Sequence, residues 1–425
     1  MTRAAMARAA ADEPLPRWLV GALFALFGLI VIKAASSEIT FDEAWSFMFY
    51  GRDLFGFSRL DLANDHPLNS LLIFVSTRIF GDGEFAIRLP NVLAGAAYLW
   101  CCAHVVRRSA SVPLAFAFCA LQIYVIDYFT LARGYGLATA LVMAGLTRFL
   151  RSDGRSRAYG ELLAFLFAAS LAIFSCFMIT LAAVAAHAAL SAWRASRDGQ
   201  LSLRVLWRSE RIGLVFLALC AVPMAGLHWV SRPGVPLWGS EDGLFGAMAV
   251  GVARMYVGDR FATAGAVAGL AAMVVLVGAA RRRLSSRSLF LLLVTGFLLF
   301  GFFLTFHLLH RPLPADRVLL PMMPVWLLLV VCLVDDLAAP LDPRRLRHAR
   351  AGALALAVVL GGAFLHRCHI ATTSDQPGAQ PLRPALVKAL AAHRCVPFAI
   401  WSNYAQTYYM YRWFGDAMPE ETPCR

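Results

Sequence analysis

The sequence has few charged residues for its length. Asp, Glu, Lys and Arg make up 15% of its 425 residues, whereas 60% are hydrophobic, and the mean hydropathy is +0.64. This composition lies far outside the range of water-soluble globular proteins and predicts a polytopic membrane protein. It excludes a large soluble domain, because the longest polar stretch is the C-terminal tail.

Motifs for zinc and nucleic-acid binding are also lacking. The nine cysteines include no C-x-x-C pair and no cysteine–histidine spacing suited to zinc. No segment reads as an RNA- or DNA-binding module, although the net charge is +13. The basic residues lie in short clusters between apolar runs, which is the positive-inside distribution of membrane proteins. We therefore expect a lipid bilayer as a partner and no nucleic acid.

What the sequence does contain is a series of apolar segments. The first, Trp18–Ala35, is long and lacks a small-residue cleavage site, which predicts an uncleaved signal anchor. The later segments, several of them shorter than the ~20 residues of a full crossing, lie at 90–106, 111–126, 131–150, 159–173, 175–193, 211–229, 262–280, 288–306, 316–334 and 349–366. We expect an all-α polytopic membrane protein with about eleven transmembrane helices.

Arginine clusters predict the orientation of these helices. Arg3, Arg8 and Arg17 precede the first segment, which places the N-terminus in the cytoplasm. Five later clusters fall on the same side, at 107–108, 148–157, 194–211, 281–287 and 344–350. The tail is then outside. The 35-residue apolar run Tyr159–Trp193 is divided at Phe174–Ser175–Cys176, because this alternation needs two crossings there.

The first outer loop, 36–88, holds most of the polar residues that suggest chemistry. Its segments Phe41–Phe57 and Pro67–Phe80 predict two amphipathic helices at the membrane surface. Asn64 or Asp65 is the expected start of the second, because proline is tolerated in a first turn.

Two pairs of residues in this loop are candidates for catalysis. Asp42 and Glu43 can act as a general base or bind a divalent cation. Thr40 and Glu43 also fit a capping box, which favours a structural role for Glu43 and leaves Asp42 open between the two readings. Asp65 is either a helix cap or a functional acid, and His66 is either a surface residue or part of the site.

Seven arginines on the expected outer side run against the positive-inside trend. An interfacial anchor that snorkels is the favoured reading for Arg254 and Arg260. Several arginines on one side suggest an anionic ligand such as a lipid phosphate or pyrophosphate, because arginine binds phosphate through two hydrogen bonds. The seven are Arg88, Arg133, Arg232, Arg254, Arg260, Arg311 and Arg317.

Short motifs follow one another in the order and topology of a known superfamily. They are Asp42-Glu43, Asp65-His66-Pro67-Leu68, Arg88-Leu89-Pro90, Ala132-Arg133-x-Tyr135 and Arg317-x-Leu319-Leu320-Pro321. Over residues 18–335 the series resembles the GT-C integral-membrane glycosyltransferases, in the branch of protein O-mannosyltransferases and lipid A aminoarabinose transferases. Leu68 departs from the His-Pro-Pro common in the second motif, and the tail is shorter than the outer domain of many relatives. The resemblance therefore bears more on the donor than on the acceptor.

The resemblance implies a role for each matching residue. Asp42 matches the catalytic base, with Glu43 as its companion. Asp65 matches a second acid that binds the acceptor or, together with Asp42, a divalent metal such as Mg²⁺ or Mn²⁺. The substrate-binding positions are His66, Arg88, Arg133, Tyr135 and Arg317.

The same resemblance implies the substrates and the location. The donor is a polyprenyl-phosphate-linked sugar, the acceptor an envelope lipid, glycan or protein, and the location the bacterial inner (plasma) membrane. A nucleotide-sugar site is not needed, and no Gly-rich phosphate loop is present.

We expect two domains. Residues 1–366 form a GT-C-like transmembrane domain, and 367–425 form a small extracytoplasmic tail domain. The aromatic residues of the tail favour packing at the membrane interface over stacking on a sugar. A disulfide such as Cys395–Cys424 fits an oxidising compartment.

Two other functions compete with the enzyme. A transporter or flippase for an anionic lipid-linked solute predicts internal repeats and ionisable residues within the spans. No repeat is evident, polar residues such as Gln122 and His187 are few, and Asp127 is open between a helix cap and a part of the site. A non-catalytic assembly factor would not need acids followed by arginines on one face. The sequence therefore favours a glycosyltransferase.

Overall fold

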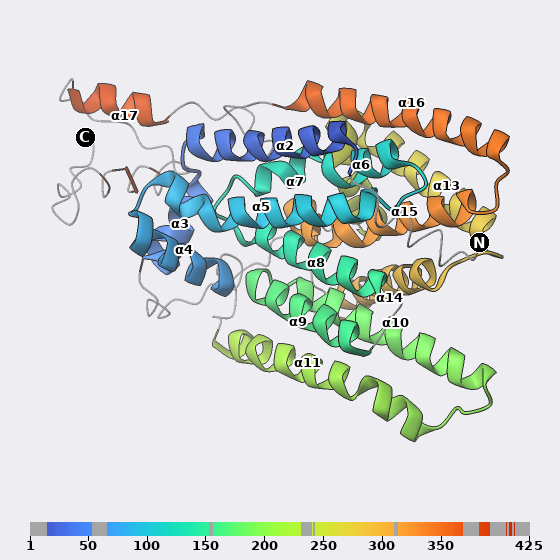
Figure 1. Cartoon of the computed structure of the whole chain (residues 1–425). Helices are drawn as coiled ribbons and strands as arrows, with labels where there is room; N and C mark the ends of the chain where they lie inside the picture. Colours follow the sequence, from blue (N-terminus) through green and yellow to red (C-terminus); the bar gives the residue numbers. More distant parts are fainter. Residues whose placement is uncertain are drawn as a thin grey trace.

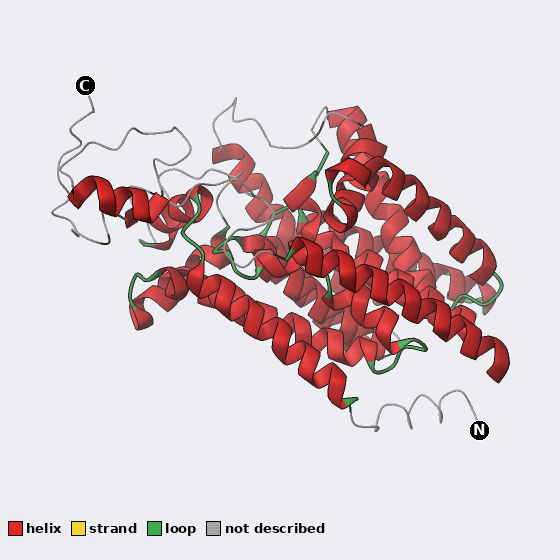
Figure 2. Ribbon diagram, turned by 90° about the horizontal axis from the view of Figure 1, so that it is seen from above, coloured by secondary structure: helices red, strands yellow, loops and turns green. Residues whose placement is uncertain are grey.

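The computed structural model describes residues 15–52, 66–152, 156–230, 240, 243–309, 313–368 and 382–391, together with residues 405, 408, 409 and 412. Within these residues every regular element is a helix, and the sole β-pairing is the single bridge between Ser240 and Leu313 (Figure 2). The prediction of an all-α fold is confirmed.

Long apolar helices run side by side through most of the molecule (Figure 1). In chain order the described elements are α2 (Arg17–Ser36), α3 (Phe41–Ser46), the π-helix η1 (Phe47–Gly51), α4 (Pro67–Phe80), α5 (Glu84–Val106), α6 (Val112–Ala120), α7 (Ile123–Tyr128), α8 (Gly134–Arg151), α9 (Ser156–Ala172), α10 (Cys176–Arg197), α11 (Leu203–Val230), the π-helix η3 (Phe245–Val250), α12 (Gly251–Val257), η4 (Asp259–Phe261), α13 (Ala262–Ala280), α14 (Ser286–Leu309), η5 (Asp316–Met322), α15 (Met323–Ala338), α16 (Pro343–Arg367) and α17 (Leu382–Ala391).

Seven of the described helices are long and apolar enough to cross a membrane. They are α2, α5, α10, α14 and α16, and α13 and α15 together with the short 3-10 helices that precede them. Helices form here because lipid offers no hydrogen bonds to the backbone, so an apolar segment must satisfy its own N–H and C=O groups. The fold is that of a polytopic membrane protein, and the number of eleven crossings stays a prediction.

The structure confirms one predicted division and corrects another segment. The long apolar run is divided where expected, because α9 ends at Ala172 and α10 begins at Cys176. The segment 111–126, predicted as one span, is instead two short helices, α6 and α7, that break at Leu121. The side-chain amide of Gln122 donates to the carbonyls of Ala117 and Phe118, which lie in the last turn of α6. The sequence analysis had not assigned this capping role to Gln122.

A hydrogen bond next to Pro90 links α4 to α5. Pro90 lies inside α5 and has no N–H to offer the carbonyl of Ala86, four residues earlier. The hydroxyl of Ser76 in α4 donates to that carbonyl instead, at 2.6 Å. The surface helix α4 is therefore fastened to α5 at the point where the helical hydrogen bond is missing.

The first outer loop differs from its prediction in two details. The helix that begins at Phe41 changes into a π-helix at Phe47 and reaches Gly51, while residues 53–65 lie outside the described part of the chain. The helix Pro67–Phe80 has the predicted bounds, but the residue before it, His66, occupies the capping position and makes no side-chain cap. Asn64 and Asp65, the expected start of this helix, lie outside the described residues.

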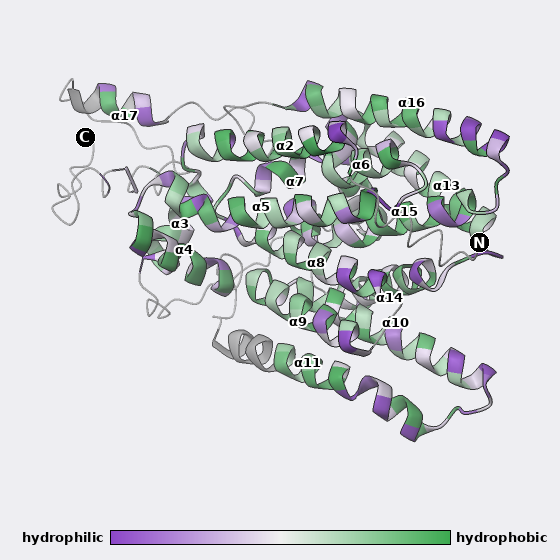
Figure 3. Cartoon of the chain, in the orientation of Figure 1, coloured by the Kyte–Doolittle hydropathy of each residue, from purple (hydrophilic) through white to green (hydrophobic). Residues whose placement is uncertain are grey.

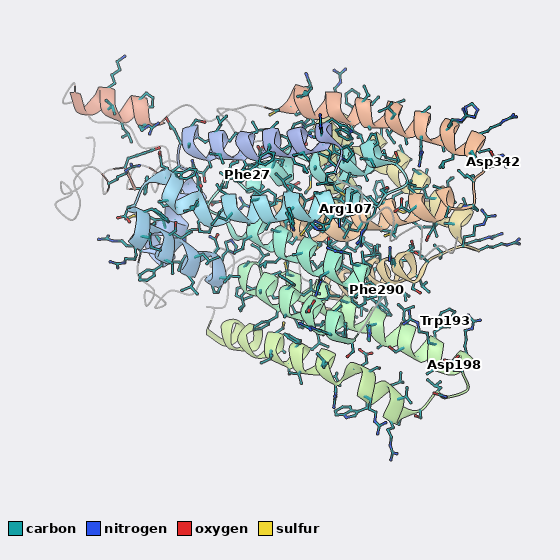
Figure 4. The ribbon with its side chains drawn as sticks, in the orientation of Figure 1. Phe27, Arg107, Trp193, Asp198, Phe290 and Asp342 are labelled. Atoms are coloured by element: carbon teal, nitrogen blue, oxygen red, sulfur yellow. The ribbon has the colours of Figure 1, made fainter. Side chains whose placement is uncertain are left out.

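The two ends of the helix bundle differ in character. Helices α3, α4 and α17 lie at the left-hand end in Figure 1, and the connections α10–α11 and α15–α16 lie at the right-hand end. Asp198 and Asp342 mark these two connections in Figure 4. Hydrophilic residues colour the right-hand ends of α10, α11 and α16, whereas their middles are apolar (Figure 3). The predicted arginine clusters of these connections therefore share one end of the bundle.

Helix α8 lies at the centre of the bundle (Figure 1). It packs against α5, α9, η5 and α15, and nearly all its apolar side chains are buried. Apolar side chains on outer helices, such as Val274 of α13 and Val358 of α16, are 72% and 66% exposed and suit contact with lipid. The buried helices at the centre of the bundle thus support the elements at its left-hand end, α3 and α4 among them (Figure 1).

Candidate active site

The segment that enters α3 is held by the predicted capping box. The Thr40 hydroxyl accepts from the Glu43 N–H at 3.3 Å, and the Glu43 carboxylate accepts from the Thr40 N–H at 2.9 Å. This confirms the structural reading of Glu43 and fixes the turn that carries Asp42.

The Glu43 carboxylate makes three more hydrogen bonds. The Arg88 guanidinium donates to both of its oxygens, and the Ala132 N–H donates to Oε1 at 2.7 Å. Four hydrogen bonds therefore occupy the two oxygens, which is about the capacity of a carboxylate. Burial acts to raise the pKa of Glu43, but Arg88 and these hydrogen bonds outweigh it and lower the pKa. Glu43 is a buried structural anion with no oxygen left for a substrate proton.

Arg88 was predicted to bind substrate phosphate, but all its N–H donors already have partners within the protein. Besides Glu43, its guanidinium donates to the carbonyls of Ala34, Ser37 and Glu38 at 2.6 to 2.9 Å. All five N–H groups of an arginine are satisfied in this way, and the side chain is 1% exposed. The geometry does not fit the expected phosphate contact. It fits a residue that fastens α2, α3 and α5 together.

A chain of amides, which the sequence analysis missed, fixes the peptide before Arg133. The Ala132 carbonyl accepts from Asn69 at 3.2 Å, while its N–H donates to Glu43. Asn91 donates to Asn69 at 2.8 Å and accepts from the N–H of Leu137, in the first turn of α8. Both asparagines are fully buried. Two amides on otherwise apolar helices were the signal that could have revealed this network.

Two glycines let α8 approach its neighbours. A Cβ on Gly134 would lie 2.2 Å from the Ala172 carbonyl oxygen, and one on Gly136 would lie 2.4 Å from the Tyr128 carbonyl oxygen. No side chain fits at either position. The glycines that flank Tyr135 therefore place Arg133 at the start of α8 within reach of α3.

Asp42 lies between two guanidiniums. Its Oδ2 atom accepts from Arg317 Nη1 at 2.8 Å and lies 3.3 Å from Arg133 Nη2. Arg133 Nη1 also donates to the Asp42 backbone carbonyl. The side chains of Asp42 and Arg317 are 23% and 31% exposed, whereas that of Arg133 is 2% exposed. Residues from three distant parts of the sequence thus meet at one partly open site.

The two arginines keep Asp42 ionised. Burial alone would raise the pKa of its carboxyl, but Arg133 and Arg317 outweigh burial and hold the pKa below its usual value. Arg133 still has donor capacity, because its Nε atom has no hydrogen-bond partner among the described residues. The site therefore combines a carboxylate with guanidinium groups that are able to bind an anion.

Arg317 is presented by an unusual backbone. The preceding residue, Asp316, has a φ of 48°, in the left-handed region that few residues other than glycine and asparagine adopt. Its carboxylate holds this conformation by accepting from Arg254 at 2.7 Å. Asp316 is the first residue of the 3-10 helix η5, so Arg317 extends from the first turn of that helix toward Asp42.

His66 lies beside this site and packs against Tyr135. Its ring is 4% exposed and forms an edge contact with Tyr135, with 5.5 Å between the ring centres. Neither ring nitrogen has a hydrogen-bond partner within the described part of the chain. Burial, Arg133 and Arg317 all lower the pKa of His66 well below its usual value. His66 is therefore a neutral group able to donate one hydrogen bond and accept another.

The described residues do not fit the predicted divalent metal. Asp42 is paired with two cations and Glu43 is saturated, and no cluster of three or more His, Cys, Asp or Glu side chains occurs among the described residues. Arginines beside a carboxylate also repel a metal ion. The predicted second ligand, Asp65, lies outside the described residues.

The other outer arginines separate into different roles. Arg254 pairs with Asp259 and Asp316 rather than only snorkelling. Arg260 lies over the Phe261 ring at 5.4 Å, which suits the expected interfacial anchor. Arg232 and Arg311 lie outside the described residues.

Part of the tail packs on the first outer loop. Tyr409 donates to Glu84 at 2.6 Å and accepts from the N–H of Ile39, and Tyr408 donates to the Asp82 carbonyl. Both tyrosines are buried, with Tyr408 against the ring of Phe47. These two tyrosines pack on protein, and the membrane-interface role expected for the tail aromatics stays a prediction. The proposed Cys395–Cys424 bridge lies outside the described residues.

Two buried polar groups inside the bundle were not expected. Lys33 of α2 and Asp127 of α7 form an ion pair at 2.5 Å, with side chains 1% and 2% exposed. Asp127 lies inside α7 and pairs with Lys33, so it is not a simple helix cap. The Nδ1 atom of His187 in α10 lies 2.7 Å from the Oε1 atom of Glu210 in α11, and the His187 ring stacks on that of Tyr159.

Comparisons with known proteins give two distant structural neighbours. No protein-family model and no curated protein matches the sequence. The crystal structure of ArnT from Cupriavidus metallidurans bound to undecaprenyl phosphate aligns with a TM-score of 0.49 and 14% identity, over 92% of this chain and 74% of that chain. The apo structure of the same protein aligns with a TM-score of 0.47 and 14% identity, over 83% of this chain and 65% of that chain.

ArnT is a lipid A aminoarabinose transferase of the GT-C fold, the branch that the sequence motifs resemble. Similarity at this distance says nothing of the ligand or the reaction.

Proposed function

We propose that this protein is a membrane glycosyltransferase that moves a sugar from a polyprenyl-phosphate donor to an envelope lipid, glycan or protein. The observation that carries the proposal is the position of Asp42 between Arg133 and Arg317, at the end of the bundle opposite the arginine-rich connections. A carboxylate beside guanidiniums supplies a base and a phosphate site together.

In the proposed reaction the acceptor oxygen or nitrogen attacks the anomeric carbon of the sugar. Asp42 takes the proton from the acceptor, a bond forms to the anomeric carbon, and the bond from that carbon to the phosphate oxygen breaks with inversion. The phosphate of the lipid leaves with the electron pair. Arg133 and Arg317 stabilise the negative charge that develops on it.

The charges of the site suit each stage of this reaction. Taken by themselves, ionised Asp42, Arg133 and Arg317 sum to one positive charge, which matches the single negative charge of a phosphodiester donor. When Asp42 takes the proton, the site gains a second net positive charge while the leaving lipid phosphate becomes a dianion. Charge is therefore balanced before and after transfer.

The neighbouring residues take supporting roles in the proposal. Glu43 and Arg88 position the turn that carries Asp42, in place of the catalytic and substrate-binding roles predicted for them. Tyr135 positions the ring of His66, and His66 offers a hydrogen bond to the sugar. Asp65 keeps its role as a second acid through the resemblance alone, because it lies outside the described residues.

We further propose that the site faces the outside of the bacterial inner membrane. The arginine-rich connections 194–211 and 344–350 lie at the other end of the bundle (Figure 1), and such clusters favour the cytoplasmic side. The N-terminus is then cytoplasmic. The tail, proposed as a domain over 367–425, contributes Tyr408 and Tyr409 to the outer side.

To test the proposal, the wild-type gene is replaced with a gene that encodes the Asp42→Asn variant. Mass spectrometry of lipid-linked sugars and envelope glycans should show that one polyprenyl-phosphate sugar accumulates and that one glycan residue is lost. The loss of a general base lowers the rate about 100-fold or more. Asp198→Asn, at the opposite end of the bundle (Figure 4), is the control and should retain activity. Unchanged lipid-linked sugars and glycans in the Asp42→Asn strain would contradict the proposal.

A transporter or flippase for an anionic lipid-linked solute is the second candidate. The observations that favour it are the buried pairs Lys33–Asp127 and His187–Glu210, because ionisable groups inside a membrane bundle often mark a transport path. It predicts that purified protein in liposomes moves a polyprenyl-phosphate sugar between leaflets without an acceptor. Sugar transfer without such movement would exclude it.

A further inference from the structure

The guanidiniums proposed to bind the donor are already occupied by Asp42. Both approach the same oxygen, Oδ2, at 2.8 Å for Arg317 and 3.3 Å for Arg133. A carboxylate and a phosphate are both anions that arginine binds through the same N–H groups. The unliganded site is therefore an anion site that holds a side-chain anion.

This arrangement is unfavourable for a base. Two cations beside a carboxylate stabilise its ionised form and lower its affinity for a proton. A base is most effective when its affinity for a proton suits the operating pH. Asp42 gains that affinity when another anion neutralises the arginines.

We infer that the donor phosphate displaces the Asp42 carboxylate from Arg133 and Arg317, so that donor binding itself activates Asp42 as the base. The inference rests on the proposed function and concerns how the site is regulated. Before binding, the carboxylate is paired with both guanidiniums. After binding, the phosphodiester takes its place, and the released carboxylate faces the acceptor.

The structure offers the freedom that this exchange needs. The side chains of Asp42 and Arg317 are partly exposed, at 23% and 31%, so neither is fully enclosed by the described residues. Arg133 is held by the fixed peptide of Ala132 and has an Nε atom that is unpartnered among the described residues. The arginine stays in place while the anion on it changes. An acceptor that arrives first finds an inactive base, so the donor has to bind first.

The experiment measures binding of a labelled short-chain polyprenyl phosphate to the purified full-length protein in detergent. If Asp42 competes with the phosphate, the isosteric Asp42→Asn should bind this probe at least about fivefold more tightly than wild type. The comparison is made at high ionic strength, where through-space repulsion between Asp42 and the phosphate is screened, and equal affinity there would show that Asp42 does not compete for the arginines. Asp198→Asn is the matched control and should bind like wild type, and the neutral polyprenol shows how much of the binding depends on phosphate.

A second set of variants tests the arginine directly. Arg317→Gln should weaken binding of the probe, and Asp42→Asn should give less improvement when Arg317 is already Gln, because the competition needs that guanidinium. Thermal unfolding in detergent shows whether each variant is folded. If Asp42→Asn is not folded, Asp42→Ser takes its place in the binding measurements.

The outcomes separate the inference from the proposed function. Tighter binding by Asp42→Asn, with its transfer activity lost, supports both. Equal or weaker binding by that variant, with transfer lost, overturns the competition and leaves the glycosyltransferase proposal standing. Wild-type protein that binds polyprenol as well as polyprenyl phosphate contradicts both.

Discussion

Arg88 and Glu43, 45 residues apart, are joined by two parallel hydrogen bonds. Nε lies 2.8 Å from Oε1, and Nη2 lies 2.9 Å from Oε2. The two side chains are 1% and 0% exposed. Removing one partner of such a pair leaves the other charge with neither water nor a counter-ion, which is far more unfavourable than losing a surface ion pair.

Arg88→Met is therefore expected to lower the free energy of unfolding by ~3–5 kcal/mol, measured by thermal or denaturant unfolding in detergent. Arg88→Met combined with Glu43→Gln should recover part of this loss, because no unpaired charge then stays buried. Arg157→Met is the control, since Arg157 is 90% exposed, and should change the value by no more than about 0.5 kcal/mol. An Arg88→Met protein as stable as this control would show that the pair does not hold α3 to α5.

The glycine at the start of α8 gives a second prediction about stability. Alanine at Gly134 would place its Cβ 2.2 Å from a backbone oxygen of α9, so the helices would have to separate. We expect a loss of about 1–3 kcal/mol together with weaker binding of polyprenyl phosphate, because Arg133 moves with α8. Gly160→Ala is the matched control, since nothing lies within 4 Å of its Cβ. Equal melting temperatures for the two variants would contradict the predicted close approach.

The pH dependence of transfer is expected to report on Asp42. Its pKa is below the usual 3.8, so the carboxylate persists as the pH falls from neutral to about 4, and kcat/KM for the donor should stay flat over that range. Below that pH, protonation removes the base and the rate falls. Arg317→Gln removes one of the two cations, raises the pKa of Asp42 and shifts the fall to higher pH.

Arg260→Gln serves as the control for this pH series, because Arg260 contacts Phe261 and not Asp42. Each sample is returned to neutral pH and assayed again, which separates titration from unfolding. If kcat/KM falls at the same pH in wild type and in Arg317→Gln, Asp42 is not the group that titrates.

Local sequence was enough to predict much of the fold. Apolar runs located the helices, and arginine alternation divided the run at Phe174–Ser175–Cys176 correctly. The capping box of Thr40 and Glu43 was also visible, because its residues are three positions apart. These features depend on residues that are close together in the sequence or on composition, and both can be read directly from the sequence.

The partners of the charged residues were harder to predict. Charge shows that Arg88 needs an anion, but not that Glu43 rather than a lipid phosphate supplies it. Asn69 and Asn91 escaped notice because neither belongs to a chemical motif, and their role arises only when α4, α5 and α8 meet. The break at Leu121 was missed because Gln122 competes for backbone carbonyls through its side chain, which apolar run length does not reveal.

The hydrogen bond from the Ile39 N–H to the Tyr409 hydroxyl joins residues 370 positions apart. Proteins are made from the N-terminus, so the segment that contains Ile39 is synthesised long before Tyr409 exists. A chain that stops before Tyr409 still contains Asp42, Arg133 and Arg317, yet it cannot close this contact. Only a chain translated through Tyr409 completes the hydrogen bonds to Ile39 and Glu84, which links the final packing of this region to the completion of synthesis.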